Sequence, residues 1–457
     1  MMNYGILSKY NKTKGTLFTP KQLQKLIYPL IIEQVLAITV GMVDTIMISY
    51  AGEAAMSGVS LVDMINNLMI NIFVAIATGG TVVLSQYLGS KNIKKASKAA
   101  SQLIMIAVVI STIFMIIFIF NSHFILKLFF GAIESDVMKN AKIYFLISAC
   151  SYPFIAVFGS CSAIFRSMGN TKISMKISIG MNILNGIGNA ILIFGFSMGV
   201  MGAALSTLFS RTVGTLVIFS LLDRKKNLVT ISHKEIFMWD KEMIYRILYI
   251  GIPSGIENGI FQLGRVLVVS IISNYGTTQI AANAVANGLD SMGTIAGQAM
   301  NLAMLTVIGH CMGAQKKDEA VFYTKKIWKL TYQITLGINI VILVLLPILL
   351  NLFSLSKEVY QYAYILVFIH NGMAILLWPT AFTMPNALRA AGDVKFCMFI
   401  SIFSMIAFRI FFSVILGTWL GLGIIGVWIA MVIDWIFRAS LFTLRLMKGK
   451  WLEYKII

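Results

Sequence analysis

Long apolar runs separated by short polar connectors make up most of the sequence. A transmembrane helix needs about 20 apolar residues, and twelve runs are long enough, near 26–49, 56–88, 99–121, 138–165, 173–195, 200–222, 244–273, 281–312, 327–353, 359–388, 395–417 and 421–444. Because the hydrocarbon core offers no water to pair with the backbone, these runs predict helices. We therefore expect an all-α polytopic membrane protein with 12 transmembrane helices. The second, fourth, seventh, eighth and tenth runs are the longest, so they should tilt, bend or project beyond the membrane.

The two halves of the sequence repeat each other. Pro29, Glu33, Gly52 and Gly89 recur at one constant spacing as Pro253, Glu257, Gly276 and Gly313, and Arg166, Gly169 and Lys172 recur at a spacing one residue shorter as Arg389, Gly392 and Lys395. Each half then holds six helices, and because six is even the repeats are parallel, with a pseudo-two-fold axis along the membrane normal. We predict an N-lobe at 1–222, a cytoplasmic linker at 223–243 and a C-lobe at 244–457. Parallel repeats of this kind build many secondary transporters. The two R-x-x-G-[ND]-x-K motifs are interpreted as cytoplasmic loop anchors.

Composition and charge narrow the class of protein. Hydrophobic residues make up 58% of the chain and charged residues 12%, which excludes a soluble enzyme, a disordered chain and a disulfide-built secreted domain. The net charge of +19 lies mainly in alternate connectors and both tails, so both termini should be cytoplasmic in the plasma membrane. The positive charge then indicates contact with anionic lipid and not with nucleic acid. Four cysteines form no C-x-x-C pair and no P-loop motif occurs, so we expect no metal cofactor and no ATP-driven step.

Two acids lie in the first apolar run. Eleven residues separate Glu33 from Asp44, a rotation that ends about 20° from the starting face, with a rise of roughly 16 Å. Pro29, one turn before Glu33, removes a backbone hydrogen bond and favours a bend. Since charged side chains inside a membrane are costly, each is either a structural hydrogen-bonding group or part of a functional site.

Amides and a hydroxyl of the fifth and sixth runs are the second polar feature. Asn185 and Asn189 are four residues apart and share a helical face, with Asn182 a further turn back. Thr207 lies in the sixth run. Their oxygens and amides can support a carboxylate or help to bind a hard cation such as Na⁺. The alternative is that they only join helices through hydrogen bonds.

The remaining acids point to a substrate cavity. Glu257 lies near the middle of the seventh run, one turn after Pro253, as Glu33 follows Pro29. We expect Glu257 to be unpaired and to attract cationic substrate, and we place Glu33 in the same substrate cavity. Asp63 and Asp290 fall at nearly equivalent places in the two repeats, where either could pair with an arginine inside the membrane or face substrate.

These motifs together resemble the multidrug and toxic compound extrusion (MATE) family. The resemblance rests on VDTIMISYAG in the first run, FRSMGNTK after the fourth, NILNGIGNAILIFG in the fifth, GVMGAALST in the sixth and ALRAAGDVKF after the tenth. It implies a V-shaped transporter with two bundles and a cavity between them. It also implies export of cationic or amphipathic small molecules in antiport with Na⁺ or H⁺, the coupling ion, with no other cofactor.

The resemblance assigns the cation site residue by residue. It places Asp44, Asn185, Asn189 and Thr207 at the N-lobe site for Na⁺ or a proton, and it matches Glu257 to the acid of the seventh helix. Many members carry an acid where Asn189 stands, so the coupling ion stays open. The tenth run reads LLWPTAFTMPNALR, without an acid, which argues against a second ion site in the C-lobe.

Three other functions agree less well with the sequence. A flippase for lipid or lipid-linked oligosaccharide, from the same broader superfamily, should have a strongly cationic cavity, whereas acids outnumber arginines inside the runs here. An intramembrane enzyme should carry a motif such as H-E-x-x-H, which the sequence lacks. A passive channel would not need two lobes with acids on bent helices. We therefore expect a monomeric transporter and not an enzyme.

Overall fold

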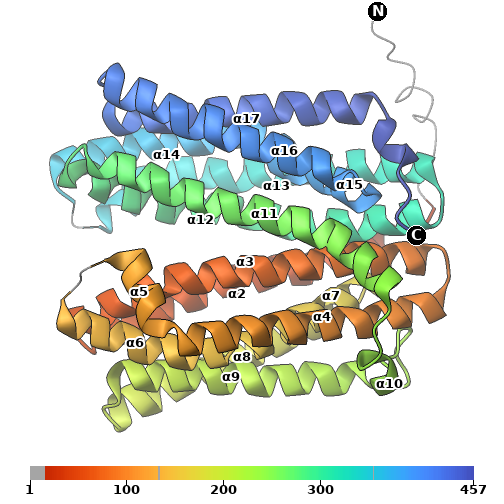
Figure 1. Cartoon of the computed structure of the whole chain (residues 1–457). Coiled ribbons are helices and arrows are strands. Elements are labelled where there is room, and N and C mark those ends of the chain that lie inside the picture. The colour runs from red at the N-terminus through yellow and green to blue at the C-terminus, as the bar shows by residue number, and fades with distance from the viewer. Residues whose placement is uncertain (1–15, 132–133, 354) are drawn as a thin grey trace, which may run out of the picture. The chain divides into compact units, whose positions relative to one another are not determined.

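The computed structural model describes residues 16–131, 134–353 and 355–457, which form helices joined by short turns (Figure 1). The first repeat contains α2 (Pro20–Ser49), α3 (Glu53–Gly89), α4 (Ile93–Phe120), α5 (Ser122–Phe130), α6 (Ser135–Cys150), α7 (Tyr152–Ser167), α8 (Thr171–Asn189), η1 (Ala190–Gly195) and α9 (Gly199–Leu222). After the short α10 (His233–Ile236), the second repeat contains α11 (Lys241–Ser273), α12 (Thr277–Gly313), α13 (Lys317–Asn351), α14 (Lys357–Trp378), η2 (Pro379–Thr383), α15 (Met384–Ala391), α16 (Val394–Ser404), η3 (Met405–Phe411), η4 (Val414–Trp419), α17 (Gly423–Met447) and η5 (Lys450–Glu453). No strand occurs in this described part of the chain.

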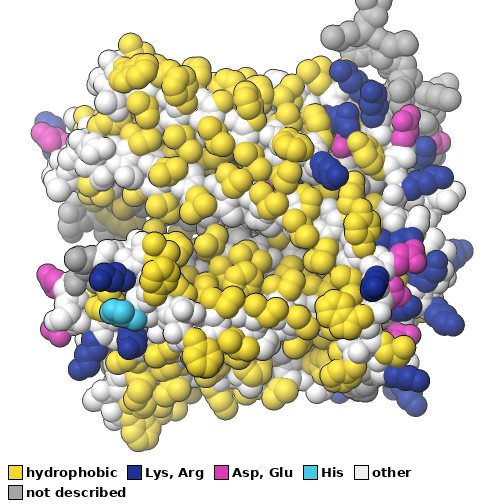
Figure 2. Space-filling view, viewed as in Figure 1, with side chains coloured by type: hydrophobic (Ala, Val, Ile, Leu, Met, Phe, Trp, Pro, Cys, Tyr) yellow, Lys and Arg dark blue, Asp and Glu magenta, His cyan; other side chains and the backbone are white. Residues whose placement is uncertain are grey.

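The helices match the predicted membrane spans. Among the described residues, eleven helices are long and apolar enough to cross a membrane, and the bent pair of α6 and α7 supplies a twelfth. The prediction of an all-α membrane protein with 12 spans is therefore confirmed. Figure 2 shows hydrophobic side chains over the long middle parts of the helices, while charged side chains gather near the helix ends. That pattern suits hydrocarbon around the middle and headgroups at the ends.

Prolines explain where two of the long spans are interrupted. The fourth span bends by 45° between α6 and α7. Pro153, the second residue of α7, has no N–H to donate to the carbonyl one turn earlier. At the break, the carbonyl of Ser148 accepts from both the N–H and Oγ of Ser151, at 2.9 Å and 2.6 Å. In the tenth span the wide turn of η2 begins at Pro379, between α14 and α15. A wide π-turn absorbs the carbonyls that a proline leaves without a donor.

The backbone repeats as the sequence does. Left-handed residues recur in pairs, namely Gly52 and Gly276, Lys91 and Gln315, Gly169 and Gly392, Ser197 and Gly421, and Gly199 and Gly423. The offset between the starts of α8 and α16 is one residue shorter than the offset between the starts of η1 and η4. Only the second repeat has the π-helix η3 between these two points. Because a π-turn holds one more residue than an α-turn, η3 accounts for the change in offset.

Backbone contacts divide the chain into two compact units. Unit 1 comprises Ile256–Ile456 with the N-terminal residues to Thr19, and unit 2 comprises Pro20–Gly255 with Ile457. The predicted linker 223–243 packs within unit 2, where Gln102 Nε2 donates to the carbonyls of Glu235 and Met238 at 2.6 Å and 2.7 Å. The lobe bounds 1–222 and 244–457 stay a prediction.

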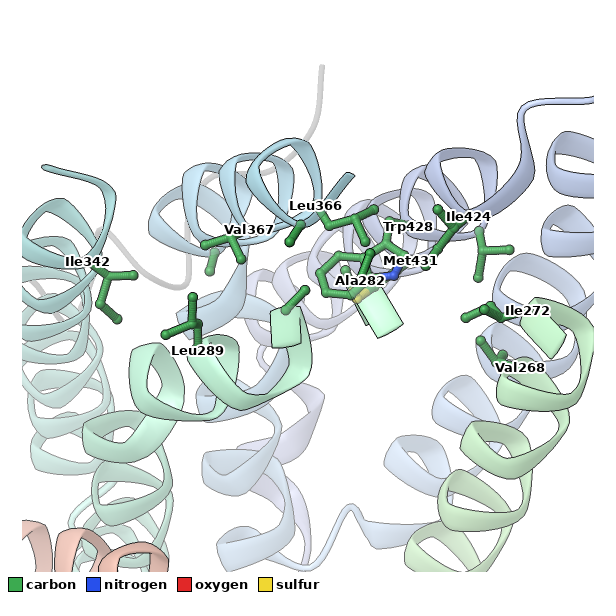
Figure 3. Close-up of a cluster of buried hydrophobic side chains, with 14 of the residues drawn as sticks. Val268, Ile272, Ala282, Leu289, Ile342, Leu366, Val367, Ile424, Trp428 and Met431 are labelled. Atoms are coloured by element: carbon green, nitrogen blue, oxygen red, sulfur yellow. The ribbon is translucent and has the colours of Figure 1, made fainter. Parts of the chain in front are cut away.

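Each unit has its own apolar interior. In unit 1 the cluster of Val268, Ile272, Ala282, Leu289, Ile342, Leu366, Val367, Ile424, Trp428 and Met431, with further buried neighbours, is called here the unit 1 apolar cluster. Figure 3 shows its side chains pointing inward from α11, α12, α13, α14 and α17. In unit 2 a separate cluster joins α2, α3, α6 and α9 and includes Ile48, Val62, Phe145 and Ala203.

Candidate functional site

The four residues predicted to bind a cation lie together in unit 2. Asp44 comes from α2, Asn185 and Asn189 from α8, and Thr207 from α9, because α8 packs against both α2 and α9. Asn189 Nδ2 donates to Asp44 Oδ1 at 2.7 Å. We call these four residues the Asp44 site.

Asn185 connects the carboxylate to the hydroxyl. With its amide nitrogen turned toward Asp44, Asn185 Nδ2 lies 2.9 Å from Oδ1 and 3.2 Å from Oδ2, and its oxygen accepts from Thr207 Oγ1 at 3.1 Å. In the opposite orientation the amide oxygen would face the carboxylate, and two acceptors would meet without a proton between them. We therefore assign the orientation in which Nδ2 faces Asp44. Ser206 Oγ also donates to the backbone carbonyl of Asn185 at 2.8 Å, which fixes α9 against α8.

One oxygen of the site has no partner. The side chains of Asn185 and Asn189 are buried and that of Asp44 is half-buried. Asn189 Oδ1 accepts no hydrogen bond within the described residues. An unpaired buried amide oxygen is costly, whereas amide, hydroxyl and carboxylate oxygens are the donors that a hard cation takes. The residues present therefore fit a Na⁺ ion, and the Asp44 carboxylate alone could instead hold a proton.

A second acid and an arginine complete the electrostatics. Asp44 interacts electrostatically with Asp63 of α3 and Arg211 of α9. Asp63 accepts a hydrogen bond from Asn66 Nδ2 at 3.3 Å, and Arg211 Nη1 donates to Ser151 Oγ at 2.8 Å. Two carboxylates and one guanidinium leave a single net negative charge. The sequence indicated an arginine partner for Asp63 but not that Asp44 shares it.

Glu33 and Glu257 lie in a different setting from the Asp44 site. Glu257 Oε1 is 2.6 Å from Arg389 Nη2, and Arg389 Nη1 donates to Asn386 Oδ1 at 2.8 Å. The expectation of an unpaired Glu257 is therefore wrong, because Arg389 of α15 neutralises it. In the first repeat Glu33 interacts electrostatically with Arg166 at the equivalent position. The recurrence of both acids and both arginines in the two repeats was the signal that could have predicted the pairing.

Asp290 has a different partner again. Its Oδ1 lies 3.2 Å from His370 Nδ1, and both side chains are buried. The structure thus brings the cation-site residues together, with Asp63 interacting with Asp44. It places Glu33, Glu257 and Asp290 in other settings, each beside another charged or titratable group. The role of these four acids toward substrate stays a prediction.

Comparisons with known proteins agree with this architecture. A family model, MatE, matches residues 29–191 and again 253–415, so the family pattern occurs once in each repeat. The "Uncharacterized transporter YisQ" of Bacillus subtilis is 29% identical over 94% of both chains. The "Probable multidrug resistance protein NorM" of Thermotoga maritima is 26% identical, over 98% of this chain and 97% of that one.

A solved structure supports the fold. It is described as the outward-facing conformation of a multidrug resistance MATE family transporter of the MOP superfamily, and it superposes with a TM-score of 0.89 and 20% identity. The match covers 96% of this chain and 99% of that one. Since the MatE model matches both repeats and most of the chain, this protein belongs to the MatE, or MATE, family of multi-pass membrane transporters, as its motifs predicted, and is not an enzyme.

Proposed function

We propose that this transporter exports cationic or amphipathic small molecules across the plasma membrane in exchange for one monovalent cation, Na⁺ or H⁺, bound at the Asp44 site. The observation that carries the proposal is the unpartnered Asn189 Oδ1, buried next to a carboxylate that Asn189 and Asn185 hold in place. A bound Na⁺ would give that oxygen a partner. A proton would instead neutralise the Asp44 carboxylate, which the amides could still support.

The charge of the surroundings favours a monovalent ion. Asp44, Asp63 and Arg211 together carry one net negative charge, and Asp44 interacts with both of the others. One Na⁺ or one proton would make the group neutral, whereas a divalent ion would leave an excess positive charge in a poorly solvated place. Uncompensated charge is the costly condition in such surroundings.

The second repeat offers an internal comparison. At the offset that relates Pro29 to Pro253, Asp44 corresponds to Val268 and Thr207 to Met431. Both counterparts belong to the unit 1 apolar cluster, and Figure 3 shows them in it. The repeated fold is thus compatible with apolar residues at these positions. This supports a ligand role for the polar residues in unit 2 over a purely structural one.

The site's location indicates how a cation could affect transport. Its residues come from α2, α8 and α9, so an occupant would tie three helices together. Asn189 is the last residue of α8 before the π-helix η1, and π-turns within helices often accompany functional sites. Pro29 lies inside α2, where it weakens the helix against bending. Cation release would then free α2 to move relative to α8.

Cargo recognition is the less direct part of the proposal. We keep Glu33, Asp63, Glu257 and Asp290 as the acids proposed to attract cationic substrate. For Glu257 this requires cargo to compete with Arg389, whose guanidinium lies 2.6 Å away. The flippase alternative is not favoured, because the MatE model accounts for both repeats.

Efflux from vesicles under separately imposed gradients tests the proposal. Native protein is reconstituted with ethidium, and a pH gradient or a Na⁺ gradient is applied alone. We expect at least one gradient to drive ethidium uphill in native protein and neither to do so in Asp44→Asn. Ethidium movement that depends on neither gradient would contradict antiport. Uphill ethidium movement in Asp44→Asn would show that the Asp44 site is not needed for coupling.

A further inference from the structure

A buried acid and a buried histidine meet in unit 1, away from the Asp44 site. Asp290 of α12 and His370 of α14 are each 6% exposed, and His370 Nδ1 lies 3.2 Å from Asp290 Oδ1. α12 and α14 pack against each other, and in Figure 3 the neighbouring Leu289 and Val367 point toward one another from these helices. The tenth run has no acid, but the structure places a histidine of that run beside an acid of the eighth.

The hydrogen bonds around this pair are incomplete. His370 Nδ1 also lies 3.0 Å from Asn371 Oδ1, so one ring nitrogen faces two acceptors. Asp290 Oδ1 receives no aligned hydrogen bond within the described residues, and the same is true of Asn339 Oδ1 on α13. Buried acceptors without donors are costly. An N–H at Nδ1 of His370 faces the acceptors of this pair, and with a proton on both ring nitrogens the imidazole becomes a cation beside the Asp290 carboxylate.

The ring of His370 is well placed to carry a positive charge. Its centroid is 5.0 Å from that of Trp435 and 5.8 Å from that of Trp428, both on α17. Both ring contacts are T-shaped, and the Asp290 carboxylate supplies the charge opposite to that of a protonated ring. A protonated imidazole would therefore have a carboxylate on one side and two indoles close by.

Charged groups from neighbouring elements lie around the pair. Arg409 of η3 interacts electrostatically with Asp290 and also with Arg265 of α11 and the α17 pair Asp434 and Arg438. Three guanidinium groups against two carboxylates leave one net positive charge while His370 is neutral. A proton bound by His370 would therefore join a group of buried charges that already interact with one another.

The first repeat shows that the fold does not require a charge here. At the offset that relates Pro29 to Pro253, the first-repeat counterpart of Asp290 is Asn66. Asn66 Oδ1 accepts from Tyr152 Oη at 2.9 Å and from Ser148 Oγ at 3.3 Å. The first repeat thus fills the position with a neutral hydrogen-bonded amide. The acid is specific to the second repeat, and Asp290→Asn restores the residue of the first.

We propose that Asp290 and His370 form a second proton-binding site, in unit 1 and separate from the Asp44 site. The proton adds to the neutral imidazole of His370, and the imidazolium Nδ1–H donates to the Asp290 carboxylate, so no other bond is made or broken. Loading the site creates an ion pair between the eighth and tenth spans, and unloading leaves Asp290 facing Arg409. The proposal stands whether or not the Asp44 site couples transport.

Histidine NMR on the purified full-length protein tests this site directly. The chain has four histidines, so ¹⁵N-histidine labelling gives few signals, and His370→Gln identifies that of His370. We expect the native His370 signal to change between its neutral and its charged position as the pH is lowered. In Asp290→Asn the response of this signal to pH should differ from that of native protein, because the opposite charge is lost.

Controls separate this proposal from the Asp44 site. In Asp44→Asn the His370 titration should keep its native midpoint, whatever happens to efflux. If Asp290→Asn does not fold, proton uptake by native protein and by His370→Gln is compared over the same pH range, and the variant should take up one proton fewer. A His370 signal that stays neutral to pH 5, an unchanged pH response in Asp290→Asn, or equal proton uptake in native protein and His370→Gln would overturn the proposal.

Discussion

At the scale of single residues, Asp44 carries the coupling prediction. Asp44→Asn keeps the shape of the side chain but removes the negative charge that the bound cation would neutralise. We expect gradient-driven efflux to fall to background while expression and folding are retained. Asp136→Asn, at an exposed acid in the first turn of α6, is the control and should transport like native protein. Full efflux in Asp44→Asn would contradict the assignment.

The neutral ligands should have smaller effects than the acid. Asn185→Ala and Asn189→Ala each remove an oxygen ligand and an amide that supports Asp44. We expect each variant to need about tenfold more coupling cation, which corresponds to about 1.4 kcal/mol of binding free energy. Asn182→Ala, one turn back on α8, is the matched control and should keep the native dependence. If both variants showed native Na⁺ and H⁺ dependence, the four-residue site would be wrong.

The pair of Glu257 and Arg389 separates a structural from a cargo-binding role. Arg389→Ala leaves a buried carboxylate without its partner and should lower the free energy of unfolding by about 3–5 kcal/mol. The double variant with Glu257→Gln should recover part of that loss, as measured by thermal unfolding in detergent. If Glu257 also binds cargo, Glu257→Gln alone should weaken binding of a cationic dye and flatten its pH dependence. If Glu257→Gln lowers stability but binds the dye as native protein does, the role of Glu257 is structural.

At the scale of helices, the N-terminal segment makes a contact that the sequence did not indicate. The backbone N–H groups of Thr16 and Leu17 donate to Glu319 Oε2 at 3.0 Å and 2.7 Å. The N–H of Phe18 donates to Tyr323 Oη at 2.9 Å. Glu319 and Tyr323 are buried on α13. These contacts explain why residues 16–19 belong to unit 1.

Removing the acceptor should release this segment. In Glu319→Ala we expect faster amide hydrogen exchange at residues 16–18, since two of their donors lose a charged acceptor worth about 1.5–3 kcal/mol for each hydrogen bond. Asp318→Ala, at the exposed neighbouring acid, should exchange like native protein. Unchanged exchange in Glu319→Ala would show that other contacts hold the segment.

Helices were the part of the fold that the sequence predicted best. Apolar length alone located the spans, because the membrane sets how long they must be. The wide turns η1, η3 and η4 were not predicted. The pattern of apolar residues is the same whether the backbone hydrogen bonds of a run form α-helical or π-helical turns. The bend favoured at Pro29 falls within α2, which runs through it. The interruptions lie instead at Pro153 and Pro379, which no prediction had used.

The candidate site was predictable for a related reason. Asn185 and Asn189 are four residues apart in the sequence, a spacing that places both on one helical face. The resemblance of the motifs to those of the family then assigned them to one site with Asp44 and Thr207. The partners from distant helices were not predictable. Arg389 lies 132 residues from Glu257, and nothing in a single sequence relates His370 to Asp290. Such pairings depend on helix packing, which the repeat offset reveals only where both halves keep the same residues.

At the scale of the whole molecule, the two repeats share a backbone but differ in chemistry. The left-handed turns recur in both. The acid and hydroxyl of the Asp44 site nevertheless correspond to apolar residues in the second repeat, and Asp290 corresponds to an amide in the first. We therefore expect the two units to respond to different ions or at different pH, with the coupling cation bound in unit 2 through Asp44.

Direct cation binding to purified protein tests the role of Asp44 without transport. Native protein and Asp44→Asn are titrated with Na⁺ at alkaline pH by calorimetry, and their proton uptake is measured over a range of pH without Na⁺. We predict that native protein binds one more monovalent cation per chain, Na⁺ or H⁺, than Asp44→Asn, and that the pH response of His370 is the same in both. Equal Na⁺ binding and equal proton uptake in the two proteins would contradict this assignment.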